Sequence, residues 1–234
     1  MTTLLSTAYL GPIQYYAKLF GADALIEERC DHYVKQTYRN RCLIATASGV
    51  QALTIPVEGR PKDQGGDAKT PVRDIRLSDH GRWRDLHWNA LVAAYDSSPY
   101  FAYYADEFAP TYRGQQQWLV DFNSELQHTV LRLLDLRPNL HINDSHYLDP
   151  AHLEGEVVDL RERIRPKLGH YWDPRFQSLP YTQVFAHRNG FLPNLSIVDL
   201  LFNLGPEARL ILHRSDPQRA AQPLAAHVRP PLAW

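Results

Sequence analysis

The sequence is poor in cysteine and has no long apolar run, and both absences restrict the class of protein. Cys30 and Cys42 are the only two cysteines among 234 residues, which excludes the disulfide framework of small secreted domains. No run reaches the roughly 18 apolar residues that cross a bilayer. The first five residues lack the basic and apolar parts of a secretory signal. We therefore expect reduced thiols and a cytoplasmic location.

The chain also lacks an excess of charge of either sign. It has 25 lysines and arginines against 26 aspartates and glutamates, so neither a nucleic-acid footprint nor a membrane-surface patch is indicated. Hydrophobic residues make up 44% of the sequence, enough for a sizeable core and too many for a disordered chain. We expect a globular protein whose partner is a small molecule rather than nucleic acid, without membrane insertion.

Motifs that would dictate a reaction are missing as well. The sequence contains no phosphate-binding loop, no G-x-G-x-x-G and no G-x-S-x-G. Cys30, His32 and Cys42 do not follow the close spacing of zinc motifs. A nucleophilic role for Cys42 would require a neighbouring base and a lowered pKa, and neither is visible. We therefore expect no metal and no cofactor.

What the sequence does contain is a strand–helix–strand pattern at its start. Residues 4–10 have extended character, and Gly11 and Pro12 break the pattern. Apolar residues then recur at helical spacing up to Gly21, and residues 24–26 resemble a second strand. This order is typical of a parallel sheet with a crossover helix. We predict an α/β fold: a single domain with a mixed, mostly parallel sheet, an N-terminal β-α-β unit and flanking helices.

The later elements follow from periodicity and turn residues. Apolar runs on either side of Ser48 and Gly49 predict a β-hairpin, and residues 58–71 are Gly- and Pro-rich, which predicts a mobile loop. Whether this loop forms a lid is left open. The other predicted elements are strands at 72–77 and 140–142, helices from Trp83 and over 113–136, a short helix at 159–164, a helix capped by Asn194 and ended by Gly205, and a last helix at 206–213. We expect one domain over residues 1–214 and a disordered tail over 215–234.

The densest group of chemically useful side chains follows the second predicted strand, where open α/β sheets place ligand-binding loops. Arg39 and Arg41 are suited to a phosphate or carboxylate, and Lys35 adds a positive charge. Asn40 suits a sugar hydroxyl, and His32 suits a general base. The alternatives are a solvated loop whose arginines pair with nearby acids, or a structural connector. The whole group comprises Asp31, His32, Lys35, Tyr38, Arg39, Asn40 and Arg41.

Three further positions carry alternatives. His87, on the apolar stripe of the Trp83 helix, is either a core histidine or a catalytic base partnered by Asp31 or Asp199. Asp199 and Asn203 share one helix face, which favours a buried hydrogen-bond network over the wall of a site. The start of the helix after Pro12 offers free N–H groups that would suit an anion.

Several segments together resemble the WbqC-like family. They are residues 9–16 (YLGPIQYY), 32–42 (HYVKQTYRNRC), 98–101 (SPYF) with two tyrosines at 103–104, and 190–206 (GFLPNLSIVDLLFNLGP). The most specific parts are TYRNR at 37–41 and PNLS at 193–196. The resemblance covers most of residues 5–213. It implies a bacterial protein encoded near surface-polysaccharide functions and the transfer of an acyl or aminoacyl group to an amino sugar.

The leading hypothesis is a transferase that acts on an activated or nucleotide-linked amino sugar. Asp31, His32 and His87 are the catalytic candidates. Lys35, Tyr38, Arg39, Asn40, Arg41 and Gln14 are the substrate-binding candidates. The alternative is a non-catalytic module that binds a sugar nucleotide or a partner enzyme of the same pathway.

Overall fold

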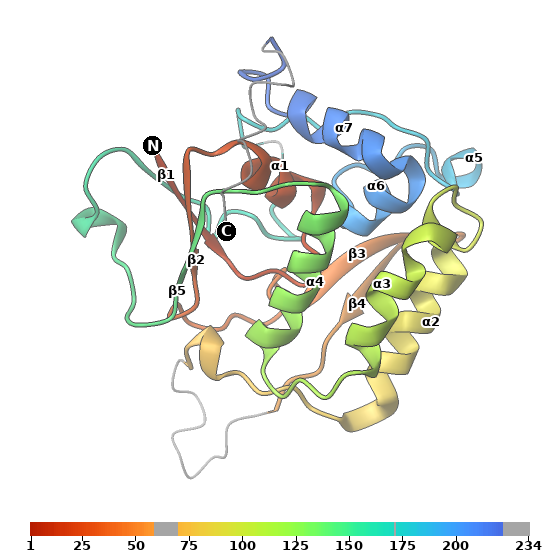
Figure 1. The fold of residues 1–234 in the computed structure, drawn as a ribbon, viewed down its shortest axis with the longest axis horizontal. Helices are drawn as coiled ribbons and strands as arrows, with labels where there is room; N and C mark the ends of the chain where they lie inside the picture. The colour runs from red at the N-terminus through yellow and green to blue at the C-terminus, as the bar shows by residue number, and fades with distance from the viewer. Residues whose placement is uncertain (59–69, 171, 222–234) are drawn as a thin grey trace, which may run out of the picture.

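The predicted strand–helix–strand unit forms the centre of the molecule. Strands β1 (Thr2–Ser6) and β2 (Ala24–Glu28) are parallel neighbours, and α1 (Ile13–Gly21) connects them. Strand β5 (Leu140–Asn143) pairs with β2, and β6 (Val157–Asp159) pairs with β1, both in parallel. The sheet order is therefore β5-β2-β1-β6 (Figure 1). This confirms an α/β fold with a parallel sheet.

The computed structural model describes residues 1–58, 70–170 and 172–221. Most of the loop predicted over 58–71 lies outside the described residues. So does the predicted tail from residue 222 onward. Residues 215–221 form turns in which Ser215, Asp216 and Arg219 are buried, so packed structure continues beyond residue 214.

The first strand is shorter than predicted. It ends at Ser6, and residues 7–10 leave the sheet towards the turn before β3, where the Tyr9 amide donates to the Tyr38 carbonyl at 2.8 Å. Leu10 has a φ of 41°, a left-handed conformation that no strand accommodates. The apolar residues of this segment are buried by packing under α1 rather than by pairing in the sheet.

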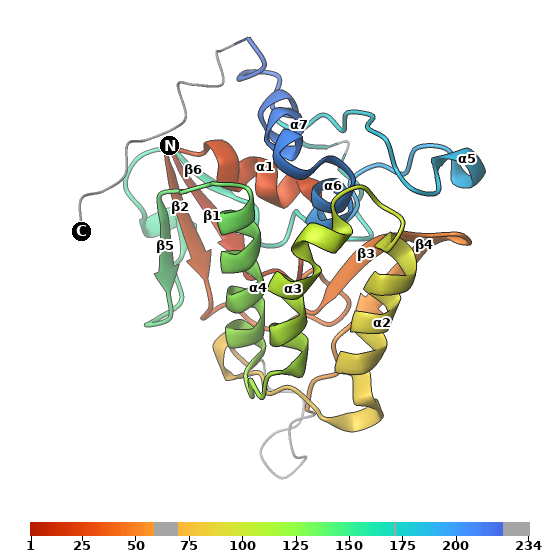
Figure 2. The same ribbon diagram turned by 45° about the vertical axis from the view of Figure 1, so that its right-hand side comes forward.

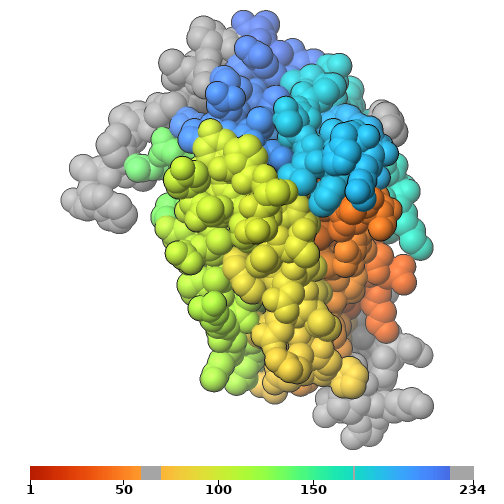
Figure 3. Space-filling model, turned by 90° about the vertical axis from the view of Figure 1, so that its right-hand side faces the viewer, coloured from red at the N-terminus to blue at the C-terminus, as the bar shows by residue number. Residues whose placement is uncertain are grey.

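The predicted hairpin is confirmed, and it forms a separate two-stranded sheet. Strands β3 (Arg41–Thr46) and β4 (Gly49–Thr54) are antiparallel. Residues 47 and 48 form the turn, and Gly49 begins β4 with a φ of 102°, a conformation that glycine adopts without steric cost. Beside the hairpin, helices α2 and α3 form the yellow and yellow-green surface seen in Figure 3.

Three helices stand side by side over the hairpin and the central sheet (Figure 2). They are α2 (Trp83–Tyr95), α3 (Phe101–Arg113) and α4 (Leu119–Leu133). The predicted helix from Trp83 is confirmed. The single helix predicted over 113–136 is wrong at its start, because α3 ends at Arg113 and extended residues separate it from α4. Among the described residues, no helix is long and apolar enough to cross a membrane.

Two other predicted elements are wrong. In place of a strand at 72–77, Val72–Asp74 forms a 3₁₀ turn, whose period of three brings Val72 and Ile75 to the same side and buries both. In place of a helix at 159–164, strand β6 runs to Asp159 and turns follow it. The Leu160 amide donates to the Leu4 carbonyl at 2.9 Å, which ties this segment to β1.

The C-terminal helices are α5 (Ala186–Asn189), α6 (Ile197–Leu204) and α7 (Ala208–Arg214). Gly205 ends α6 with a φ of 54°, as predicted. The predicted cap is wrong: the Ser196 side chain, not Asn194, accepts from the Val198 amide at the start of α6.

Asn194 instead caps α1. Its Oδ1 accepts from the Gln14 amide at 2.9 Å, and the Leu195 carbonyl accepts from the Ile13 amide at 2.9 Å. The anion site considered at the start of α1 is therefore wrong, because these two amides already have partners.

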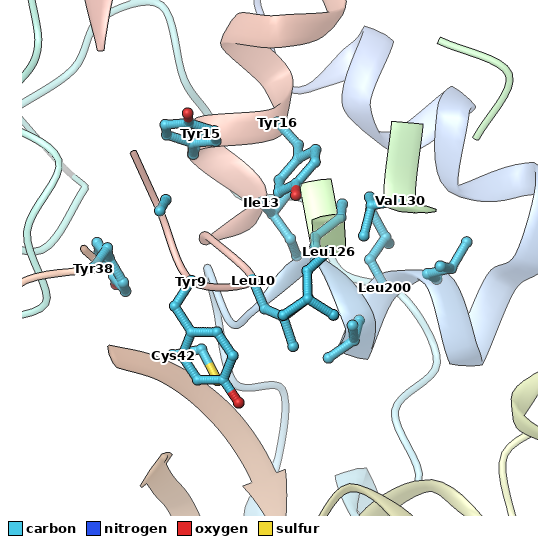
Figure 4. Close-up of a cluster of buried hydrophobic side chains, with 14 of the residues drawn as sticks. Tyr9, Leu10, Ile13, Tyr15, Tyr16, Tyr38, Cys42, Leu126, Val130 and Leu200 are labelled. Atoms are coloured by element: carbon cyan, nitrogen blue, oxygen red, sulfur yellow. The ribbon is translucent and has the colours of Figure 1, made fainter. Parts of the chain in front are cut away.

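One hydrophobic core joins these layers. In Figure 4, residues of the β1–α1 connection, such as Tyr9 and Leu10, lie beside Leu126 and Val130 of α4 and Leu200 of α6. All five are buried to 99% or more. The core thus fixes the segment that leaves the carboxyl end of β1.

Candidate functional site

The carboxyl ends of the parallel strands meet at one edge of the sheet. From β1, the chain crosses to β2 on one side, whereas β6 pairs with the other side of β1. Open α/β sheets bind ligands at such a reversal of strand order. A narrow cavity of about 10 Å³ lies there, the size of one water molecule. We call it the β1–β6 crevice, lined by Leu5, Ser6, Thr7, Ala8, Tyr15, Thr37, Tyr38, Arg39, Leu160, Arg161 and Ile164.

A buried ion pair dominates the polar side of the crevice. The Arg39 side chain is 2% exposed, and its Nη2 donates to Asp31 Oδ2 and, at 2.7 Å, to Glu162 Oε1. The Ser6 hydroxyl donates to the same Asp31 oxygen at 2.8 Å. Within the described part of the chain, Arg39 Nε and Asp31 Oδ1 have no hydrogen-bond partner although both are buried. Unpaired buried polar atoms are costly, and a water molecule or a ligand group in the crevice would satisfy them.

A second arginine lies next to this pair. Arg165 contacts the other carboxylate oxygen of Glu162, so that Glu162 lies between two guanidinium groups. Burial lowers the pKa of Arg165, and the positive charge of Arg39 lowers it further. Arg165 Nε is also buried without a partner among the described residues. Neither Glu162 nor Arg165 was predicted, because the segment carrying them was interpreted as a charged helix.

Arg41 lies near this group but outside the lining of the crevice. It is half-buried on β3, and its Nε donates to Thr54 Oγ1 at 2.9 Å. Burial raises the pKa of Tyr33 to about 12, while the charges of Arg39 and Arg41 oppose that rise. Tyr33 is therefore within the electrostatic reach of both arginines.

The remaining predicted residues of segment 31–41 differ in burial and in their distance from the crevice. Tyr38 is buried and lines the crevice. His32 and Lys35 are exposed on the same connection. Asn40 is buried and donates to the Ile55 carbonyl at 2.9 Å, which holds the end of β4. The structure thus brings Asp31, Tyr38 and Arg39 together in one site, whereas Asn40 has a structural partner.

Gln14 lies in another polar cluster, on α1. Its Nε2 donates to Asp173 Oδ2 at 2.8 Å, and Lys18 pairs with the same oxygen at 2.8 Å. These contacts join α1 to the segment before α5. A role for Gln14 in substrate binding stays a prediction.

His87 belongs to a buried cluster around the hydroxyl of Tyr9. Its Nδ1 is 3.0 Å from Tyr9 Oη, which is 2.8 Å from Tyr112 Oη, and its ring packs edge-on against Trp83. Burial lowers the pKa of His87 to about 4, and a hydrogen bond to the Thr54 carbonyl partly opposes this. The arrangement fits the core alternative, and a catalytic role for His87 stays a prediction.

His87 should make stability sensitive to acid. Its pKa of about 4 in the folded protein lies below the value of about 6.5 in an unfolded chain. Protonation therefore favours the unfolded state, and stability present above pH 6.5 is lost as the pH falls towards 4. We expect wild type to lose about 2 kcal/mol more than the His87→Phe variant between pH 7.5 and pH 5. Urea titrations at both pH values measure this, and equal losses would contradict it.

The predicted buried network around Asp199 is confirmed. The fully buried carboxylate accepts from Tyr95 Oη at 2.8 Å, Tyr181 Oη at 2.7 Å and Gln183 Nε2 at 3.1 Å. Asn203 donates to the Asp199 backbone carbonyl at 2.7 Å. Burial raises the pKa of Asp199, against the effect of its three donors. The network joins α2, α6 and the chain before α5.

The cysteines show no sign of activation. Burial raises the pKa of the Cys42 thiol well above its usual value, which opposes formation of a thiolate nucleophile. Burial also raises the pKa of Cys30, although Arg73 opposes it. Across the described ranges, no three His, Cys, Asp or Glu side chains are arranged to hold a metal ion.

Comparison with known proteins places the chain in a family. The sequence profile of the WbqC-like protein family matches residues 7–174, most of the chain. The "Uncharacterized protein Rv1507c" of Mycobacterium tuberculosis strain ATCC 25618 / H37Rv is 29% identical over 197 residues, which is 75% of this chain and 81% of that protein. No solved structure matches. The matched region contains Asp31, Arg39, Glu162 and Arg165.

Proposed function

Because the chain belongs to the WbqC-like protein family, we propose that it is a transferase of bacterial surface-polysaccharide biosynthesis. The reaction moves an acyl or aminoacyl group onto an activated or nucleotide-linked amino sugar. The observation that carries this proposal is the buried Asp31–Arg39 pair at the carboxyl edge of the sheet, with one unpartnered acceptor and one unpartnered donor within the described residues. Such a pair suits a substrate that carries both an amine and an anionic group.

The chemistry assigns separate tasks to the two side chains. Arg39 binds the anionic part of the substrate through charge-assisted hydrogen bonds. Asp31 Oδ1 accepts a hydrogen bond from the sugar amine and thereby orients the nitrogen lone pair. As the new C–N bond forms and the leaving group departs from the acyl carbon, the amine loses a proton to a base. His32, exposed on the same connection, is better suited to this task than His87, whose low pKa makes it a weak base.

One observation favours the non-catalytic alternative. The crevice has the volume of one water molecule, and Arg39 is already held by two carboxylates. A module that binds a sugar nucleotide without converting it would need no room for an acyl donor. Product formation separates the two functions, because the module binds ligand and releases it unchanged.

The test compares Arg39→Lys with Arg132→Ala. Lysine keeps the positive charge but lacks the planar fork of arginine, and Arg132 is exposed on α4, where it pairs with Glu107. Thermal-shift titrations with nucleotide-linked amino sugars should show at least tenfold weaker binding by Arg39→Lys and unchanged binding by Arg132→Ala. Incubation with acyl and aminoacyl donors should then give product with wild type and not with Arg39→Lys. Undiminished affinity in Arg39→Lys, with a lower melting temperature, would mean that Arg39 is a structural connector.

A further inference from the structure

A carboxylate of the protein itself lies between the two arginines at the crevice. Glu162 Oε1 accepts from Arg39 at 2.7 Å, and Glu162 Oε2 contacts Arg165. We propose that Glu162 occupies the position of a substrate phosphate, and that Arg39 and Arg165 form the phosphate-binding site that Glu162 vacates. This rests on the proposed function, because it names the anionic group of the nucleotide-linked sugar.

Glu162 is far more exposed to solvent than the buried pair of Arg39 and Asp31. The Arg39 and Asp31 side chains are 2% and 8% exposed, whereas the Glu162 side chain is 47% exposed. A half-exposed glutamate moves into water at little cost, but a buried guanidinium cannot leave its partner without a large desolvation penalty. An incoming anion therefore displaces the Glu162 carboxylate, while the Asp31–Arg39 pair stays in place.

Unused donors remain when Glu162 is bound. Arg39 Nε and Arg165 Nε are buried and have no partner within the described ranges. A planar carboxylate has two oxygens, and both are taken by the two guanidinium groups. A phosphate group presents three strong acceptor oxygens, so that it can accept from the Nε groups as well. Ser6 and Thr7 also line the cavity beside Arg39, where the Ser6 hydroxyl donates to Asp31.

The charges favour phosphate over a second carboxylate. A carboxylate ligand would replace Glu162 by a group of equal charge and equal geometry, with no gain. The diphosphate of a nucleotide-linked sugar is a diester that carries one negative charge on each phosphate. When Glu162 leaves, Arg39 keeps its pair with Asp31, and the diphosphate supplies the missing negative charge beside Arg165, whose pKa is lowered by burial and by the positive charge of Arg39. The site thus selects a phosphate or diphosphate group.

The test is the binding of inorganic pyrophosphate by isothermal titration calorimetry to wild type and to Glu162→Gln. Removal of the competing charge should tighten binding at least tenfold. The double variant Glu162→Gln/Arg165→Ala should lose that gain. The matched control is Glu107→Gln, since Glu107 is 44% exposed and pairs with Arg132 at 2.6 Å on the helical side of the molecule. Its affinity should equal that of wild type.

Two results would overturn the proposal. One is an affinity of Glu162→Gln for pyrophosphate no higher than that of wild type, with a normal melting curve showing that the variant is folded. The other is an equal gain in affinity for acetate, which would indicate a carboxylate site. Neither measurement requires turnover. If Glu162→Gln binds pyrophosphate tightly and no acyl donor gives product, the phosphate site stands and the transferase fails.

Discussion

Replacement of Arg39 by methionine is expected to lower the free energy of unfolding by about 3–5 kcal/mol. Arg39 is 2% exposed and pairs with Asp31, whose side chain is 8% exposed. The variant leaves the Asp31 carboxylate in a low-dielectric environment with the Ser6 hydroxyl as its remaining donor among the described side chains. An uncompensated buried charge is costly because its hydration is lost and nothing replaces it. Urea denaturation at pH 7 measures the change.

A double-mutant cycle isolates the pair. The variant Arg39→Met/Asp31→Leu removes both charges, and apolar replacements of buried pairs are often neutral or stabilising. We therefore expect it to recover most of the stability lost in Arg39→Met, with a coupling energy above about 2 kcal/mol. Glu162, the half-exposed second partner of Arg39, provides the comparison. The Glu162→Gln variant should lose less than about 1 kcal/mol of stability. A loss of stability in the double variant as large as in Arg39→Met would refute a buried pair.

The Asp199→Ala variant should lose about 3 kcal/mol of stability. The deletion leaves the hydroxyls of Tyr95 and Tyr181 without their acceptor, while the Gln183 amide keeps the Leu192 carbonyl at 2.9 Å. Each unsatisfied donor costs about 1–3 kcal/mol, and part of the sum is returned because a desolvated carboxylate is removed. Thermal and urea melts of the variant measure the net effect.

Two controls accompany the Asp199 variant. Asp199→Asn keeps a carbonyl acceptor of the same shape and should lose less than Asp199→Ala. Asp106→Ala removes an exposed aspartate on α3 and should change stability by less than about 0.5 kcal/mol. Equal stability of Asp199→Ala and wild type would mean that the carboxylate is kept for a ligand and not for the network.

Local signals explain which elements were predictable from the sequence. Pro12 directly precedes α1, Gly49 follows the hairpin turn with a positive φ, and Gly205 ends α6, each through a conformational preference of the residue itself. The failures lie where tertiary contacts decide. The segment 72–77 was interpreted as a strand, but Val72–Asp74 forms a 3₁₀ turn, because a period of three brings Val72 and Ile75 to the same buried side.

The candidate site was half predictable for the same reason. Asp31 and Arg39 lie in one segment, eight positions apart, and their chemistry is visible in the sequence. Glu162 is 123 positions from Arg39, and Ser6 is 25 positions from Asp31. The pairing of β1 with β2 places Ser6 near Asp31. Glu162 reaches the site only through the pairing of β6 with β1, and a three-residue strand carries too weak a pattern to be predicted.

The capping of α1 by Asn194 links the order of synthesis to the order of folding. The strand–helix–strand unit leaves the ribosome before the side chain that satisfies its helix, which lies 180 positions later. Ordering so long an intervening chain makes this contact entropically expensive and slow to form. Helix α1 therefore reaches its final state only after residue 194 has been made. A nascent chain stalled before residue 194 would expose the start of α1 and depend on chaperones.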